Sequence, residues 1–191
     1  MTDAMAVSDA TAAAGTPADE ADRPPLLQVR DLKVYFPIKE GLIFERHIAD
    51  VRAVDGVTLD VRRGETVGLV GESGCGKSTF ARAVIRLVGV TEGSIQFDGQ
   101  EIVGLFGAQL RRMRRRMQMI FQDPYASLNP RMTIGSMLAD PLRVHGLAKG
   151  ADRPRRVNEL IELVGLPKNS VGRYPHEFSG GQRQRAGIAR A

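Results

Sequence analysis

The sequence has a single cysteine among its 191 residues and no apolar run long enough to cross a bilayer. One cysteine cannot form an internal disulfide framework, which fits a reducing compartment such as the cytoplasm. The first residues lack the basic-then-apolar pattern of a secretory signal. We therefore expect neither a disulfide-stapled secreted domain nor a membrane-spanning helix in this stretch of chain.

Neither sign of charge is in large excess, because the sequence contains 27 Lys and Arg residues and 22 Asp and Glu residues. Much of the surplus lies in the arginine-rich run at 111–116. Such a run could contact nucleic acid or anionic lipid, but a solvated helix face is the simpler interpretation. The length is enough for one domain with a sizeable core.

A glycine-rich stretch carries the strongest chemical signal. It follows an apolar run at 66–70 and matches the phosphate-binding loop G-x-x-x-x-G-K-[ST]; its residues are Gly71, Glu72, Ser73, Gly74, Cys75, Gly76, Lys77, Ser78 and Thr79. The glycines let the backbone wrap around an anion, and the following helix directs its positive end to the same place. Lys77 can reach the outer phosphates and Ser78 can hold Mg²⁺. The stretch predicts nucleotide binding; the alternative is a glycine-rich turn before a helix.

A second candidate anion site lies at Phe178-Ser-Gly-Gly-Gln182. Ser179 and Gln182 have capping-box spacing, so a helix is expected to start here. Gly180 and Gly181 would let another molecule approach the N–H groups of the first turn. Many helices start with Ser-Gly, so this pattern alone is a weak signal.

The remaining pattern indicates an α/β fold. Strands are expected at 27–36, 57–61, 66–70, 94–97 and 117–121, with a loop or excursion over 37–50 and a two-residue turn at Asp98-Gly99. We expect an antiparallel β layer beside a parallel core built on the strand before the glycine loop.

Helices are expected after the glycine loop, through Phe80, Val84, Leu87 and Val88, and at 109–116. Two more are predicted in a helical insert over 123–176. The first is capped by Thr133, reaches Leu138 and is kinked or ended by Pro141. The second is capped by Asp152 and ends near Gly165. Residues 1–25 have no periodic apolar face and predict a disordered tail; 181–191 is a predicted helix without a stop signal.

Taken together, the glycine loop, the Gln after the 117–121 run and Phe178-Ser-Gly-Gly-Gln182 resemble the nucleotide-binding domain of ABC transporters over about 26–191. The P-loop sequence, the 37–50 segment and Phe121-Gln-Asp-Pro-Tyr-Ala-Ser-Leu-Asn-Pro-Arg131 look like the oligopeptide/dipeptide permease ATP-binding subunits. Nickel and glutathione importers share these features. The resemblance implies an ABC-type P-loop NTPase whose core lacks its C-terminal part here.

The resemblance also implies roles for single residues. Phe36 would stack on adenine, with Tyr35 as the second candidate and a core aromatic as the alternative. Residues 71–79 would hold the phosphates of ATP, with Ser78 on Mg²⁺. Gln122 would contact the γ-phosphate and Mg²⁺ as a catalytic and metal-binding residue, unless it is an ordinary polar residue at a strand end. Ser179, Gly180, Gly181 and Gln182 would form the signature that contacts ATP bound to a second subunit.

The same resemblance implies a pair of ATP-binding subunits, identical or different, on membrane permease subunits at the cytoplasmic face of the membrane. The permease would dock on 123–176, and no nucleic-acid partner is implied. The family's catalytic Glu and switch His follow the signature. They are expected beyond residue 191, so this chain should bind ATP without hydrolysing it efficiently.

Other interpretations remain open at this point. A P-loop kinase would share the glycine loop, but the ordered Gln122 and Ser179–Gln182 patterns argue against it. An ABC-type ATPase acting on nucleic acid or translation would use the 111–116 arginines, although such proteins usually carry two cassettes or long coiled-coil arms. A non-catalytic remnant is the fourth possibility.

Overall fold

The computed structural model describes residues 7–8, 24–40, 46–123 and 127–191. The chain divides into two compact units, Met1–Arg114 and Arg115–Ala191. Most of the predicted tail lies outside the described residues. Of that segment, Val7–Ser8 forms β1, which pairs antiparallel with β4, Gly68–Leu69.

The first unit is built on an antiparallel sheet with the strand order β3-β2-β5-β6. Its strands are β2 (Leu27–Glu40), β3 (Arg46–Val61), β5 (Glu92–Phe97) and β6 (Gln100–Glu101). The β5–β6 hairpin closes through Asp98 and Gly99, both at positive φ (53° and 74°), which are the backbone angles of the predicted two-residue turn. The antiparallel β layer is therefore confirmed.

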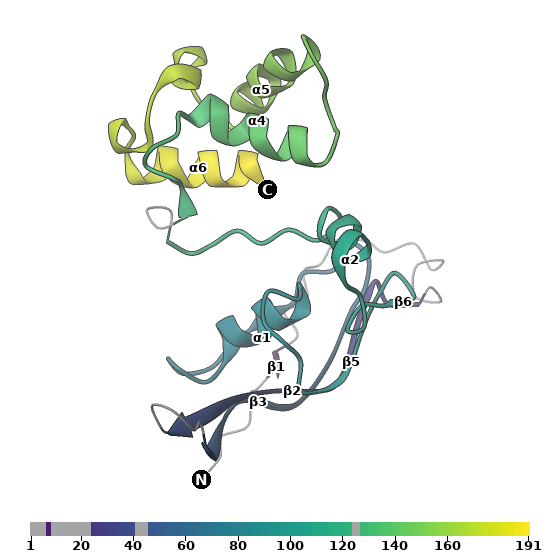
Figure 1. The fold of residues 1–191 in the computed structure, drawn as a ribbon. Helices are drawn as coiled ribbons and strands as arrows, with labels where there is room; N and C mark the ends of the chain where they lie inside the picture. Colours follow the sequence, from purple (N-terminus) through teal and green to yellow (C-terminus); the bar gives the residue numbers. More distant parts are fainter. Residues whose placement is uncertain (1–6, 9–23, 41–45, 124–126) are drawn as a thin grey trace. The chain divides into compact units, whose positions relative to one another are not determined.

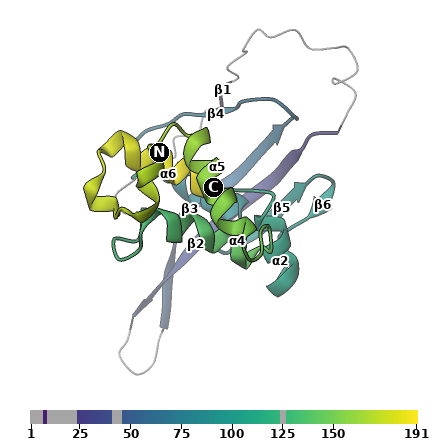
Figure 2. The same ribbon diagram turned by 90° about the horizontal axis from the view of Figure 1, so that it is seen from above.

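Of the loop or excursion predicted over 37–50, the loop is wrong where the structure describes this segment, because β2 and β3 continue as a two-stranded ribbon (Figure 1, Figure 2). Pro37 pairs with Asp50 and Ile38 with Ala49. The alternation of apolar and polar residues fails here because both faces are open to solvent. Ile38 and Ile48 are about half exposed, at 47% and 53%. A strand held by backbone pairing alone does not need a buried face.

Helix α1 (Lys77–Val84) packs against β2 and β3 (Figure 1). It is shorter than predicted, because Arg86 adopts φ 60° and ends it. Leu87 N donates to Arg82 O at 2.8 Å and Arg86 N to Ala83 O at 2.9 Å, the two bonds of a Schellman motif. Leu87 is therefore exposed and not on the helix. The second helix of this unit, α2 (Gly107–Arg114), confirms the helix predicted at 109–116 to within two residues.

The parallel core is not found among the described residues. The strand before the glycine loop is only β4, and its partner is the antiparallel β1. The apolar run at 117–121 is irregular and belongs to no strand. In a parallel core, a crossover connection would bring the 117–121 run beside the strand before the glycine loop. The 117–121 run pairs with no described strand, so this arrangement is not formed among the described residues.

The second unit is helical: α4 (Ile134–Val144), α5 (Asp152–Leu163), α6 (Gly180–Arg190) and the 3₁₀ turns η1 (Lys168–Gly172) and η2 (Pro175–Glu177). Its buried core draws on all three helices and on the turns between α5 and α6; the members include Leu128, Ile134, Leu138, Leu142, Val157, Ile161 and Phe178. The predicted helical insert, 123–176, lies within this unit.

Two predicted helix boundaries in this unit are wrong. Helix α4 continues through Pro141 to Val144, because Leu138 and Leu142 lie four residues apart on the buried face and packing outweighs the lost hydrogen bond. Helix α5 has Ala151 at its N-cap, so Asp152 is the first helical residue. From that position its carboxylate stabilises the helix by interacting with the positive end of the helix dipole.

Candidate functional site

The glycine loop runs from the end of β4 into the first turn of α1, as the sequence predicts. Gly76 is the N-cap residue of α1 at φ 99°, and no described side chain caps the helix. The N–H groups of the first turn have no acceptor within the helix. They are therefore available to an anionic ligand.

Lys77 folds back over the loop. Its Nζ donates to Gly71 O at 2.7 Å and to Glu72 O at 2.5 Å, and lies 3.5 Å from Cys75 Sγ. These bonds hold the ammonium group at the mouth of the loop. A phosphate there would meet a cation that is already in position.

Of two loop glycines with close neighbours, Gly76 faces backbone and is needed for steric reasons, whereas Gly71 faces a side chain that can rotate away. A Cβ on Gly76 would lie 2.1 Å from Ala53 O, and one on Gly71 would lie 2.6 Å from Cys75 Sγ. Ala53 is the extra residue of a β-bulge, because Val34 pairs with Val54 while Tyr35 pairs with Arg52. The bulge brings the β3 backbone against the start of α1.

This contact also places Phe36. A Cβ on Gly76 would be 3.7 Å from Val54 Cγ2, so the start of α1 covers the face of the sheet that holds Val54 and its partner Val34. Phe36 lies two residues beyond Val34 on the same strand, hence on the same face. Its side chain is 43% exposed. Its exposed ring therefore lies on the sheet face that contacts the start of α1.

Tyr35 lies on the opposite face of the sheet, where its side chain contacts Asp55 and Arg52. Its hydroxyl donates to Asp55 Oδ1 at 2.5 Å, and the Arg52 guanidinium lies 5.5 Å from the ring centroid. The hydrogen bond to Asp55 is the main reason that the pKa of Tyr35 is raised. Of the two candidates, Phe36 is the one left open for a base.

The second candidate site starts α6. Ser179 Oγ accepts from Gln182 N at 3.3 Å, and Gln182 Oε1 accepts from Ser179 N at 3.0 Å, so the capping box is confirmed. A Cβ on Gly180 or Gly181 would meet no described atom within 4 Å. Packing among the described residues therefore does not require glycine at either position. The bare backbone is free for another molecule to approach.

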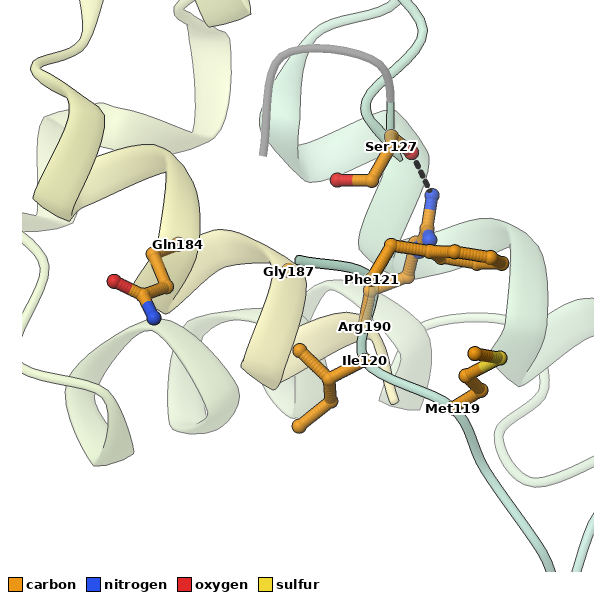
Figure 3. A pocket seen from close by; sticks show the side chains of 7 residues that line it. All are labelled: Met119, Ile120, Phe121, Ser127, Gln184, Gly187 and Arg190. Atoms are coloured by element: carbon orange, nitrogen blue, oxygen red, sulfur yellow. Dashed lines mark hydrogen bonds between the residues drawn. The ribbon is translucent and has the colours of Figure 1, made fainter. Parts of the chain in front are cut away.

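Gln122 is exposed and follows the irregular 117–121 segment. That segment lies beside α6: Met119, Ile120 and Phe121 line a small pocket with α6 and Ser127, and Arg190 donates to Ser127 O at 2.5 Å (Figure 3). Gln122 thus belongs to the same unit as Ser179–Gln182. The glycine loop and Phe36 belong to the other unit.

One residue of this region is missed by the sequence patterns. Arg183, in the second turn of α6, is buried with only 9% exposure, and its Nε donates to Pro175 O at 2.7 Å. The turn that it contacts is held by Glu177, whose carboxylate accepts from Tyr174 N at 2.6 Å. This bond is the first cause that lowers the pKa of Glu177. An arginine where an apolar residue usually stands is the signal that could have found it.

The first unit has three features that a nucleoside triphosphate could use: the uncapped N–H groups of α1, the Lys77 ammonium at the glycine loop, and the exposed Phe36 ring on the sheet face that contacts the start of α1. For a metal, the described residues offer no cluster of three His, Cys, Asp or Glu side chains. Ser78 is exposed in the first turn of α1 and provides one oxygen. Mg²⁺ at this place would take further ligands from phosphate and water, which is its usual preference in such sites.

Comparison with known families agrees with this geometry. The family model described as ABC transporter matches residues 54–191. The chain belongs to the ABC transporter family. It is 54% identical over 172 residues to the oligopeptide transport ATP-binding protein AppF of Bacillus subtilis, covering 90% of this chain and 52% of that protein. It is 55% identical over 168 residues to OppF of Salmonella typhimurium, covering 87% and 50%.

A third relative is the glutathione import ATP-binding protein GsiA of Salmonella typhimurium, 53% identical over 167 residues, with 87% of this ABC chain and 27% of that protein covered. The chain spans about half the length of the oligopeptide relatives. No described helix has the length and apolarity to span a membrane.

Among solved structures, a dimeric ATP-binding cassette in a post-hydrolysis state with ADP and Pi matches this ABC chain with a TM-score of 0.70 at 27% identity. The match covers 86% of this chain and 68% of the other. The antiparallel sheet and helices therefore belong to the α/β ABC-type P-loop fold.

Proposed function

We propose that this chain is the ATP-binding part of an ABC importer subunit for peptides or similar small solutes. The observation that carries the proposal is the glycine loop, with Lys77 on its carbonyls and an uncapped α1 directly after it. When bound, ATP would supply a phosphoanhydride whose hydrolysis to ADP and phosphate releases free energy. The chain's own residues hold the phosphates, orient the base and present a cation.

The proposed division of roles follows the two units. In the first, Phe36 stacks on the adenine, residues 71–79 surround the phosphates, and Ser78 binds Mg²⁺. In the second, Gln122 contacts the Mg²⁺ and γ-phosphate as a catalytic residue, and Ser179–Gln182 contact ATP held by another subunit. The exposed backbone at Gly180 and Gly181 supports this last role. The dimeric form of the structural neighbour supports pairing of two such chains.

Transport partners are proposed on the relatives' names, which are oligopeptide transport and glutathione import. The chain would sit peripherally at the cytoplasmic face of the membrane. Permease subunits would dock on the helical region at 123–176. Peptides are the cargo class favoured, because the two oligopeptide relatives are matched over half their length.

The test is Mg²⁺-assisted ATP binding by the chain and by Lys77→Ala, measured by isothermal titration calorimetry. A charge-assisted contact is worth roughly 1.5–3 kcal/mol, so we expect the variant to bind at least about tenfold more weakly. Lys149→Ala removes an exposed lysine from the other unit and serves as the matched control. Equal ATP affinity in Lys77→Ala and wild type would contradict the assignment of the phosphate site.

A further inference from the structure

We propose that Arg183 is a positioning residue for the N-terminus of α6. Its buried guanidinium fixes the direction in which the chain enters the helix, and so it sets where the N–H groups of Gly180 and Gly181 lie. The structural role stands by itself, and its consequence for ATP rests on the proposed function of Ser179–Gln182.

The position of Arg183 within α6 is the first observation. Ser179 is the N-cap, so Phe178 occupies N′ and Arg183 occupies N4. Helices often carry apolar residues at N′ and N4, which pack together and fix the angle of the incoming chain. Here Phe178 is 3% exposed and Arg183 is 9% exposed. The N4 position is thus buried as in that motif but carries a cation.

The contacts of Arg183 give it a directional role. Its Nε donates to Pro175 O at 2.7 Å, and one terminal nitrogen lies 3.5 Å from His176 O. Both carbonyls belong to η2, the turn immediately before Ser179. An apolar side chain would fill the same space, but hydrogen bonds also restrict distance and angle. Arg183 therefore ties the second turn of α6 to the turn that precedes the helix.

The other side of η2 is tied to the rest of the unit. The Arg173 guanidinium lies 4.7 Å from the Phe178 ring centroid, and Arg173 Nε is 3.5 Å from Glu177 Oε1. Arg173 O accepts from Ile134 N at 2.9 Å, at the first residue of α4. The turn is thus held between α4 and α6. Arg183 provides the link from α6 itself.

The charge of Arg183 does not serve the helix. The first turn of α6 has no acidic residue, and a cation near the N-terminus opposes the helix dipole. The same charge adds to the positive potential that an anion meets at Gly180 and Gly181. The positioning role therefore depends on the hydrogen bonds of Arg183 to η2, and not on its charge.

The structural test is amide hydrogen exchange, resolved by residue with NMR, on the full chain. Arg183→Met keeps most of the side-chain volume and removes the bonds to η2. Losing a hydrogen bond of this kind should speed exchange at Ser179 and Gln182 by about tenfold. Amides in the middle of α4 and α5 should change by less than about twofold. Arg183→Lys keeps one donor and should restore part of the protection.

Two outcomes would overturn the role. Unchanged exchange at Ser179 and Gln182 in Arg183→Met would show that the guanidinium does not hold the helix start. An equal rise through α4, α5 and α6 would show that Arg183 supports general core stability and nothing more specific. Arg155→Met is the matched control, because Arg155 is exposed on α5 and pairs with Glu159 at 2.9 Å.

The functional consequence is a change in how tightly two copies of the chain associate in saturating MgATP. Sedimentation velocity measures this association. Arg183→Met should associate at least about tenfold more weakly than wild type, at unchanged ATP affinity of the glycine loop. Association as tight as that of wild type would overturn the consequence. No MgATP-dependent association of the wild-type chain would count against the proposed function of Ser179–Gln182, and the exchange result would still decide the role of Arg183.

Discussion

Phe36 and Tyr35 are adjacent aromatic residues on β2, yet their environments differ. Tyr35 is held by Asp55 and Arg52, whereas Phe36 is exposed on the face that carries the glycine loop. The sequence favoured Phe36 only through family resemblance. The register of β2 against β3, with its bulge at Ala53, supplies the physical reason.

Phe36→Ala should weaken ATP binding about two- to tenfold, since an aromatic stacking contact is worth about 0.5–1.5 kcal/mol. Tyr35→Phe keeps the ring and loses only the bond to Asp55, so it should leave ATP affinity unchanged. Inorganic tripolyphosphate has no base and should bind equally to wild type and Phe36→Ala. Calorimetric titrations with both ligands make the comparison. A loss of tripolyphosphate affinity in Phe36→Ala would assign the effect to the loop instead of the base.

Glu177 gives the α6 region a pH dependence. Its lowered pKa, caused first by the bond from Tyr174 N, means that the folded chain favours the carboxylate. The stabilisation is present above the ordinary pKa of glutamate and is lost as the pH falls through the lowered folded value. The melting temperatures of wild type and Glu177→Gln should therefore differ most near neutral pH, and the difference should shrink as the pH falls below the ordinary glutamate pKa of about 4.3. A difference in melting temperature that stays constant on acidification would contradict this assignment.

At the scale of elements, features set by local sequence were predicted better than features that depend on tertiary packing or on an unusual backbone conformation. The capping box at Ser179 and the turn at Asp98-Gly99 are short-range chemistry and were predicted correctly. The extension of α4 beyond Leu138 to Val144 and the end of α1 at Val84 were not. The first depends on the buried position of Leu142, and the second on a non-glycine residue, Arg86, at positive φ. Neither helix end can be deduced from the residues that neighbour it in the sequence.

Two helical glycines of the second unit should respond to alanine with opposite sign. A Cβ at Gly135 of α4 would lie 2.5 Å from Val171 Cγ1 and 2.8 Å from Val171 O, so Gly135→Ala should destabilise by about 1–3 kcal/mol. A Cβ at Gly187 of α6 would meet nothing within 4 Å. Gly187→Ala should stabilise by about 0.5–1 kcal/mol through helix propensity. Urea denaturation measures both, and a Gly135→Ala variant as stable as wild type or more stable would contradict the close approach of α4 to η1.

On the scale of the molecule, the two units carry different parts of the candidate site. The sequence predicted both anion-binding motifs but not that the segment before Gln122 lies beside α6, because a pocket formed by 119–121 and α6 has no local pattern. The 117–121 run has the apolar composition of a strand and is irregular in the structure. Strand formation depends on a partner, and composition does not supply one.

Hydrolysis tests how much of an ABC ATPase these 191 residues contain. The proposed roles provide a phosphate loop, a Mg²⁺ ligand and a signature, and Gln122 as a contact to the metal and γ-phosphate. Efficient phosphoryl transfer also needs a residue that orients or activates water, and losing such a group typically costs about 10²–10⁴ in rate. The proposed roles assign this task to none of residues 1–191. We therefore expect phosphate release by residues 1–191 to match that of their Lys77→Ala variant. Robust turnover by residues 1–191 that disappears in Lys77→Ala would show that Gln122 and the signature suffice, and would refute this division of the catalytic residues.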